Sequence, residues 1–578
     1  MNPLRNFHLI QPFFKIHWPL FVTGIVILIF VDLLQLAIPR LIGYAVDSLI
    51  ADKKDIYQYL GLLIGVSFLI ALLRYLYREF VMGTTRRLES WLRELIFSHA
   101  LRIDLPFYDE HGPGKIMAYT TNDIAAIRVA VGFGTMLFID AVIMGLASLV
   151  VMAEMIDWRL TVWSILPLPF ILAGATRMGR SVHERFRNVQ DKFSYLTEFA
   201  QEIMAGAKII KGFSSEQNTI ERFSVANQEN VNANMKLAWL QAAYMPVTHI
   251  APLLCYAIAL YVGGSMIIDG TITVGDFAAF TGYLGLIIWP VMGLGYLINT
   301  LQRGTASLER IKQFLDQPLY EQGDNSDDEM LVCAPAIMIN NLTFRYPKAS
   351  EPALQRFSCT IPPGSIVGIV GGTGSGKSTL LKLLLRLYDP PQDAIYLNDH
   401  EIHEINIHNL RHSIGYVPQD SFLFSRSIGE NISFSSDWPR SDIEEAARLS
   451  AVHEAIDEKP QGFSTVLGEK GKKLSGGQQQ RIAIARAMVK KPHLLMFDDI
   501  FSSLDYRTQS ELLGNMREFV KGRTVLIVSQ RIAAVRDVDY ILVMNRGSVA
   551  EEGTHQELVA KGGLYYSLYE QQLVNGEE

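Results

Sequence analysis

The chain has 578 residues, a net charge of −7 and 49% apolar residues. This length predicts two or more domains, and the positive mean hydropathy favours one membrane part and one soluble part. The negative net charge argues against a nucleic-acid partner, which requires a basic surface. The cysteines, Cys255, Cys333 and Cys359, have neither metal-ligand spacing nor a disulfide framework, which suits a reducing compartment.

Apolar segments in the first half predict a membrane domain over residues 1–315. A span needs about 20 mostly apolar residues. Six segments qualify: Trp18–Leu41, Ile56–Val81, Met136–Ile156, Leu160–Met178, Pro246–Ile268 and Phe277–Leu301. The long polar stretches after the second and fourth segments are rich in arginine and lysine, for example Arg86-Arg87 and Arg185–Lys192. The positive-inside rule therefore places these stretches and both chain termini in the cytoplasm.

Four ionisable residues lie in or near the predicted spans: Asp32, Arg74, Asp140 and Glu154. A charge at membrane depth is costly and usually faces the bundle interior or a water-filled cavity. For Arg74 and Glu154 we favour a helix–helix ion pair or a position at headgroup level. For Asp32, in the middle of its span, contact with a substrate or cavity is an equally good hypothesis.

A polar, acidic linker is expected over residues 316–335, and strands then alternate with helices over 336–578, which predicts an α/β domain. Residues Gly371–Ser378 fit the phosphate-binding P-loop pattern, between a strand-like and a helix-like run. Glycine N–H groups and the helix N-terminus would bind the phosphates of ATP. Lys377 would reach the β- and γ-phosphates, and the Ser378 hydroxyl would ligate Mg²⁺.

Two further motifs follow in order. The apolar strand Leu494–Phe497 ends at Asp498, which predicts a carboxylate in the Mg²⁺ shell. Residues Leu474–Gln478 precede a predicted helix and resemble the signature motif of ABC ATPases. Because Ser475 and Gly477 would stand at a helix N-terminus, they offer a second anion site. In that family this site closes over the γ-phosphate held by the other subunit's P-loop.

The resemblance implies roles for other residues. Tyr346 would stack on adenine, and Gln419 would form the Q-loop, touching Mg²⁺ and sensing the membrane domain. Glu469 resembles the cross-talk loop, and Ser502–Asp505 resembles the D-loop. The implied ATP-binding residues are Tyr346, Gly371, Thr373, Gly374, Ser375, Gly376, Lys377, Ser378, Thr379, Gln419, Leu474, Ser475, Gly476, Gly477 and Gln478; the implied metal ligands are Ser378, Gln419 and Asp498.

A six-helix membrane domain followed on the same chain by a P-loop ATPase resembles a half-transporter of the ABC exporter type. Two short segments, Gly132–Gly134 and Leu297–Gly304, further resemble bacterial multidrug exporters. The resemblance implies a bacterial cytoplasmic membrane, a second half-transporter as partner, and ATP with Mg²⁺ as cofactors. It also implies two coupling helices that dock on the ATPase, near Gly114–Ile124 and Ser214–Asn218.

The sequence departs from the family at two catalytic positions. Asp499 stands where active members have Glu, and Gln530 stands where they have His. Asp is one methylene shorter, about 1.5 Å, and a misplacement of about 1 Å can cost on the order of 10²-fold in rate. Gln530 has no titratable ring. With Asp499, Gln530 and Gln419 as its catalytic residues, this site is predicted to bind ATP but turn it over slowly, in a heterodimer whose other site is active.

The function expected from these patterns is ATP-driven export of amphipathic drugs or other xenobiotics. One alternative keeps the fold and changes the cargo to a lipid or a peptide. Another is a regulatory nucleotide-binding subunit that supports an active partner and does little chemistry itself.

Overall fold

The computed structural model describes residues 7–574, apart from 53, 320–332, 435, 469–470, 472–473 and 502–505. It forms two compact units. The first contains Met1–Leu101 and Pro113–Gln317, and the second contains Arg102–Gly112 and Pro318–Glu578. Most of the predicted linker, residues 320–332, lies outside the described residues.

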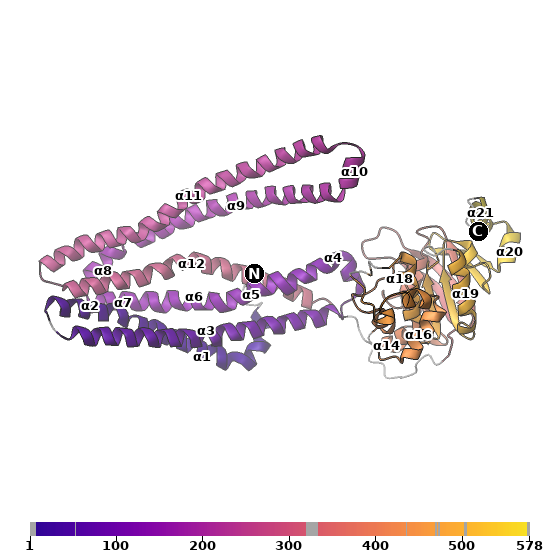
Figure 1. Ribbon diagram of the computed structural model, residues 1–578, viewed down its shortest axis with the longest axis horizontal. Coiled ribbons are helices and arrows are strands. Elements are labelled where there is room, and N and C mark those ends of the chain that lie inside the picture. Colours follow the sequence, from indigo (N-terminus) through magenta and orange to yellow (C-terminus); the bar gives the residue numbers. More distant parts are fainter. Residues whose placement is uncertain are drawn as a thin grey trace. The chain divides into compact units, whose positions relative to one another are not determined.

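Long helices build the first unit (Figure 1). Its elements are α1 (Gln11–Gln35), α2 (Ala37–Ile50), α3 (Ile56–Ala100), the end of α4 (Leu105–Ala118), α5 (Ile124–Val129), α6 (Thr135–Ile139), α7 (Gly145–Met155), α8 (Trp158–Ile165), α9 (Pro167–Ala205), α10 (Ala207–Gly212), α11 (Glu216–Ile268) and α12 (Val274–Leu315). Between α4 and α7 the helix includes π-helical turns at Tyr119–Asp123, Ala130–Gly134 and Asp140–Met144.

All of the predicted apolar segments fall in these helices. Among the described residues, three helical stretches are long and apolar enough to cross a membrane: Gln11–Ile50, Ile56–Ala100 and Leu105–Met155. The stretches Pro252–Ile268 and Val274–Ile287 are apolar but shorter. The predicted span Leu160–Met178 is divided between α8 and α9, because Pro167 starts a new helix after Leu166.

Short polar contacts fix α2 against α12. A Cβ on Gly43 would lie 2.5 Å from the carbonyl oxygen of Gly275, so the two backbones approach more closely than larger residues permit. Asp47 accepts hydrogen bonds from the Gly275 N–H and the Thr273 hydroxyl, each at 2.7 Å. Elsewhere in this unit α9 and α11 run side by side, joined through α10 (Figure 1).

The second unit contains two sheets. The six-stranded sheet has the order β10-β9-β3-β8-β7-β6, parallel except for β10, and the four-stranded sheet has the antiparallel order β2-β1-β4-β5. The strands are β1 (Ile337–Phe344), β2 (Leu354–Ile361), β3 (Ile366–Gly371), β4 (Ile395–Leu397), β5 (His400–Glu401), β6 (Ile414–Val417), β7 (Leu494–Asp498), β8 (Thr524–Val528), β9 (Tyr540–Asn545) and β10 (Ser548–Gly553).

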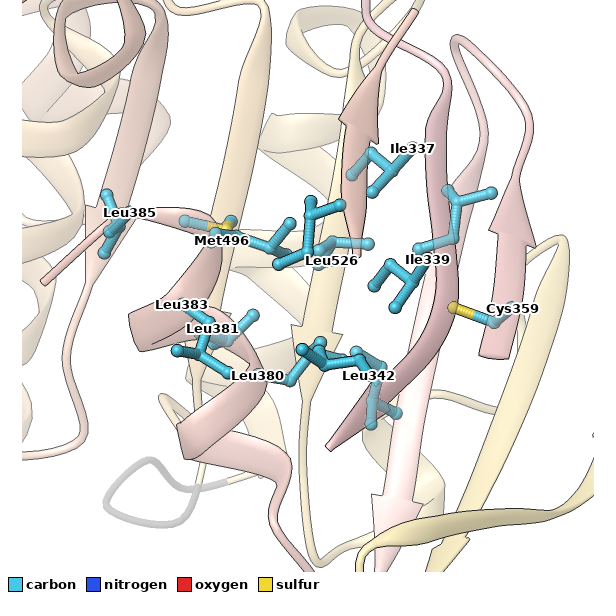
Figure 2. Packing of buried hydrophobic residues seen from close by; sticks show 14 of the residues in the cluster. Ile337, Ile339, Leu342, Cys359, Leu380, Leu381, Leu383, Leu385, Met496 and Leu526 are labelled. Atoms are coloured by element: carbon cyan, nitrogen blue, oxygen red, sulfur yellow. The ribbon is translucent and has the colours of Figure 1, made fainter. Parts of the chain in front are cut away.

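Helices cover these sheets and share their core. They are α13 (Lys377–Leu384), α14 (Ile407–Ser413), α15 (Ile428–Ser433), α16 (Arg440–Leu449), α17 (His453–Asp457), α18 (Gly476–Met488), α19 (Tyr506–Phe519), α20 (His555–Lys561) and α21 (Leu564–Val574). Figure 2 shows Leu380 and Leu381 of α13 packing among Ile339 of β1, Met496 of β7 and Leu526 of β8. The helix that opens with Lys377 is therefore held by both sheets.

A segment from the first half of the sequence completes the second unit. In Arg102–Gly112, Asp109 accepts a hydrogen bond from the Tyr388 hydroxyl and Glu110 forms a 2.5 Å ion pair with Lys348. Leu105 packs against the core. The segment ends at Gly112, whose φ of 60° favours glycine. The first coupling helix was predicted near Gly114–Ile124, which belongs to the first unit. The segment Arg102–Gly112, which groups with the nucleotide-binding fold, precedes that predicted helix in the sequence.

The second predicted coupling segment, Ser214–Asn218, belongs to the first unit. Its first residues form the turn between α10 and α11, where Ser214 has a φ of 51°. Its docking on an ATPase domain stays a prediction.

Candidate nucleotide-binding site

The sheet brings the predicted motifs to one edge. In β3, β8, β7 and β6 the strands are parallel and adjacent, so the loops after their carboxyl ends lie side by side. These loops carry the P-loop, Ser529-Gln530, Asp498-Asp499 and Pro418-Gln419 respectively. Residues separated by more than a hundred positions thereby form one candidate site.

The P-loop needs glycine where its backbone turns. At Gly371 φ is 154°, and a Cβ would lie 2.3 Å from the Met544 carbonyl oxygen. At Gly376, the N-cap of α13, φ is 98°, and a Cβ would lie 2.6 Å from the Ala353 carbonyl oxygen. Any larger residue would be strained and would clash with backbone. Between them Thr373 and Gly374 are exposed, and Ser375 closes a turn by donating its N–H to Gly372 at 3.2 Å.

Lys377 lies inside the loop that it follows. Only 7% of it is exposed, and its ammonium donates to the carbonyl oxygens of Gly371 at 2.8 Å and Gly372 at 2.9 Å. Burial lowers the pKa of Lys377, and the charges of Asp499 and Asp498 partly oppose this shift. A phosphate oxygen entering the loop would replace these carbonyls as acceptors and add a negative charge in direct contact with the buried ammonium.

Two of the three residues expected to bind Mg²⁺, Ser378 and Asp498, are in contact. The Ser378 hydroxyl donates to Asp498 Oδ1 at 2.9 Å. Burial raises the pKa of Asp498, and the negative charge of Asp499 adds to that effect. A hydroxyl and a carboxylate oxygen fit Mg²⁺, which prefers oxygen ligands and is usually completed by phosphates and water. Gln419 is exposed at the same edge, just beyond β6, and its contact with the metal stays a prediction.

Asp499 and Gln530 are also adjacent. Asp499 donates its N–H to the Val528 carbonyl at 2.9 Å and has a φ of 49°, a left-handed conformation that Asp tolerates better than most residues. Its carboxylate Oδ1 lies 3.5 Å from the Gln530 N–H. The Gln530 side chain itself is exposed. The two positions that depart from the family therefore lie side by side.

Gln572 of α21 holds the segment that contains Gln530. Its Nε2 donates to the Gln530 carbonyl at 2.7 Å, and its Oε1 accepts from the Ile532 N–H at 2.8 Å. Sequence reasoning missed this residue. A glutamine in a C-terminal helix forms no motif, and only the folded chain places it beside a loop about forty residues earlier.

Tyr346 lies next to α13. Its hydroxyl donates to Thr379 Oγ1 at 3.1 Å, and its ring packs edge-on against Tyr388 and Phe344. Lys382 stands 5.8 Å from the ring centroid. The structure thus places Tyr346 beside the P-loop helix, and its stacking on adenine stays a prediction.

The signature residues begin α18. The Ser475 hydroxyl accepts from the Gln478 N–H at 3.3 Å, and Gln478 Oε1 accepts from the Ser475 N–H at 3.2 Å, a reciprocal capping box. Ser475 and Gly476 are exposed, Gly477 is half-buried, and Leu474 packs against a hydrophobic cluster. Among the described residues no hydrogen bond joins this motif to the P-loop. Glu469 and Ser502–Asp505 lie outside the described residues.

Comparison with known proteins assigns the family. Residues 21–291 match the ABC transporter transmembrane region, and residues 354–502 match the ABC transporter family. This chain belongs to the ABC transporter family. The family confirms the predicted architecture, a helical membrane domain followed by an α/β nucleotide-binding domain, and the predicted enzyme class, an ATP-hydrolysing transporter.

Proteins of similar sequence align with this chain over nearly its whole length. A probable multidrug resistance ATP-binding/permease protein, YheI of Bacillus subtilis, is 35% identical, covering 98% of this chain and 97% of that protein. The multidrug resistance-like protein MdlA of Escherichia coli is 33% identical over 98% of this chain and 97% of MdlA. An ATP-dependent lipid A-core flippase of Syntrophus aciditrophicus is 29% identical over 96% and 92% of the two chains.

A solved structure has the same fold. A bacterial Atm1-family ABC exporter with ATP bound superposes with a TM-score of 0.78 at 26% identity, covering 97% of this chain and 98% of that one. The predicted half-transporter of exporter type is therefore confirmed at the level of fold and family.

Proposed function

We propose that this transporter is one half of a heterodimeric exporter that moves amphipathic molecules out across the bacterial cytoplasmic membrane, with both termini in the cytoplasm. The observation that carries the proposal is the contrast between two parts of one domain. Asp499 and Gln530 stand together at the catalytic edge, while the signature residues Ser475–Gln478 open α18 in an ordinary capped geometry. In the heterodimer, this chain then contributes the P-loop of the slow ATP site and the signature motif of the fast ATP site.

At its own site the residues have separate roles in this proposal. Gly371–Thr379 bind the phosphates, Lys377 neutralises their charge, and Tyr346 packs against the base. Ser378 and Asp498, with Gln419 approaching from β6, hold the Mg²⁺ that accompanies ATP. Asp499 and Gln530 position water poorly, because Asp499 is short and its Oδ1 already faces the Gln530 N–H. ATP therefore stays bound and keeps the two nucleotide-binding domains together.

Exposed apolar side chains support a partner. Along α9, α10 and the turn that follows α10, the large hydrophobic residues with more than half of their surface exposed include Phe186, Phe193, Met204, Ile209 and Phe213. Many large exposed hydrophobic side chains on one helical pair indicate a surface that another chain covers. A second half-transporter with Glu and His at the positions of Asp499 and Gln530 fits both this surface and the signature motif.

The cargo is proposed from the relatives, two of which are named for multidrug resistance. A lipid translocator is the second candidate, because the lipid A-core flippases align with nearly the same length of this chain. A regulatory subunit without transport of its own is the third, because its ATP site departs from the active pattern.

The proposal is tested by comparing ATPase rates of the purified chain alone and in complex with a partner half-transporter. We expect slow turnover by the chain alone and a large increase in the complex, stimulated by amphipathic dyes more than by lipids. A fast rate from the chain alone, abolished by Asp499→Asn, would replace the heterodimer with a homodimer.

A further inference from the structure

A cavity of about 440 Å³ lies within the helical unit, between α1, α3, the π-helical turn Asp140–Met144 and α12. Its polar lining comes from Asp32 and Gln35 of α1, Arg74 and Arg78 of α3, and Asp140. Its apolar lining includes Tyr77 and Phe133. Pockets for drug-sized ligands have volumes of about 300–1,000 Å³ and combine an apolar wall with a few polar groups.

The buried carboxylate of Asp32 is the unusual part of this lining. Asp32 is 3% exposed, and its Oδ2 has no hydrogen-bond partner among the described residues. Asp140 Oδ1, across the same cavity, also lacks one there. Desolvating a carboxylate without a partner costs several kcal/mol, and intramembrane carboxylates that persist usually mark a ligand or ion pathway. A donor from a ligand would satisfy both oxygens.

The arginines that line the cavity do not satisfy these carboxylates. Arg74 and Arg78 are exposed and one turn apart on α3, and neither donates to Asp32 Oδ2 or Asp140 Oδ1, which have no hydrogen-bond partner among the described residues. The positive charge of Arg74 acts on both carboxylates from a greater distance. The buried oxygens of Asp32 and Asp140 thus still lack a directly bonded donor among the described residues.

The backbone at Asp140 is irregular in a way that fits a ligand site. Asp140 begins one of the π-helical turns in the α4–α7 helix. Such turns are rare within helices and occur often at functional positions, because they redirect one side chain out of the helical register. Tyr77 is 7% exposed, and its ring gives the cavity an aromatic face that attracts cations.

We propose that this cavity binds the positively charged group of the transported molecule, an ammonium or amidinium attached to an apolar or aromatic body, with Asp32 and Asp140 as its counter-ions. The inference rests on the proposed export function and adds the charge class of the cargo. An anionic cargo held by Arg74 and Arg78 is the opposing reading, and the two readings predict opposite effects of the same substitutions.

The test is equilibrium binding to the full chain in lipid nanodiscs without ATP, using ethidium as the cationic probe and Nile red as the neutral one. Asp32→Asn and Asp140→Asn should each weaken ethidium binding at least tenfold and leave Nile red binding unchanged. Arg74→Gln should strengthen ethidium binding, because it removes a repelling charge. The matched control is Glu154→Gln, an exposed acidic residue of α7 outside the cavity lining, which should change neither affinity.

Three results would overturn the inference: ethidium affinity unchanged in both Asp variants, an equal loss of Nile red binding, or weaker ethidium binding in Arg74→Gln. Labelled-ATP binding to each variant verifies that the chain is folded, and Asp140→Asn serves if Asp32→Asn fails this check. Because binding is measured without nucleotide, its outcome does not depend on whether the protein exports the probe. The proposed export function has a separate test, and it is contradicted if the wild-type complex moves neither probe across a vesicle membrane.

Discussion

The side-chain amide of Gln572 bridges the backbone on both sides of Arg531, donating to the Gln530 carbonyl at 2.7 Å and accepting from the Ile532 N–H at 2.8 Å. Helix α21 therefore helps to set the position of the loop that faces Asp499.

This bridge gives the first prediction. Gln572→Ala removes two hydrogen bonds, each worth about 1 kcal/mol, so it should lower the ATP affinity of this site several-fold by loosening the Gln530 segment. Gln572→Glu keeps the acceptor for Ile532 but sets a carboxylate oxygen against the Gln530 carbonyl, so it should lose at least as much affinity. The neighbouring exposed Gln571 provides the control, because Gln571→Ala changes the same helix without touching the loop. Equal ATP affinities in the two alanine variants, measured with labelled nucleotide, would remove the positioning role from Gln572.

Lys377 carries the second prediction. Lys377→Ala deletes the ammonium that would pair with phosphate, and a hydrogen bond to a charged group is worth about 1.5–3 kcal/mol. Labelled ATP should bind this site roughly 10–100-fold more weakly. The control is Lys521→Ala, which removes an equal charge near the amino end of β8, at the opposite edge of the sheet, and should leave ATP binding nearly as in wild type. Undiminished ATP binding in Lys377→Ala would reject the P-loop assignment.

The third prediction separates the two sites of the complex. Ser475→Asp keeps an N-cap for α18, since Asp caps as well as Ser, but places a negative charge where the partner's γ-phosphate would bind. The ATPase rate of the complex should fall by a factor of ten or more, while Asp499→Asn should change it little. If Asp499→Asn proves the more damaging of the two, this chain owns the active site.

A gain of activity is the fourth prediction. Asp499→Glu combined with Gln530→His restores the longer carboxylate and an imidazole, so turnover at this site should rise. The measurement needs a partner whose own catalytic Glu is replaced by Gln, so that only this site contributes. No increase in such a complex would show that the loop geometry, including the φ of 49° at residue 499, limits the site beyond side-chain chemistry.

The cysteines allow the fifth prediction, on membrane topology. Cys333 is exposed, whereas Cys255 and Cys359 are buried, and burial raises the pKa of Cys359 to about 12. The reactive thiolate of Cys359 is therefore scarce at any pH well below 12, and at pH 8 a maleimide should modify Cys333 alone. A membrane-impermeant maleimide should label inside-out vesicles but not intact cells, and Cys333→Ser should abolish the signal. Labelling of intact cells would reverse the proposed orientation.

Residues of the proposed nucleotide-binding site could be named from the sequence because they lie in short local patterns. Gly371–Ser378 and Leu494–Asp498 are each a strand end with a fixed residue order, and the structure joins them through the Ser378–Asp498 hydrogen bond. Gln572 could not be predicted, because its role depends on a contact between a helix and a distant loop. Asp32 was recognised as unusual by its place in an apolar segment, but its cavity is formed by three other stretches of chain.

The helical part was harder to delimit. Hydropathy identified where apolar helices lie, yet Pro167 divides the predicted span Leu160–Met178, and the helices extend well beyond the apolar segments. The first coupling helix was predicted near Gly114–Ile124 from the resemblance to ABC exporters, and Arg102–Gly112 carried no hydropathy signal of its own.

Arg102–Gly112 also determines how this chain can be recombined with its relatives. A chimera that exchanges the ATPase at residue 318 would leave behind Asp109 and Glu110, the partners of Tyr388 and Lys348, and Leu105 from the hydrophobic core. Transplanting the ATPase intact needs two crossovers near residues 101 and 112 in addition to the one at 318. A substitution at Asp109 or Glu110 therefore removes a polar partner from Tyr388 or Lys348, so this short stretch belongs functionally with the ATPase although it lies in the first half of the sequence.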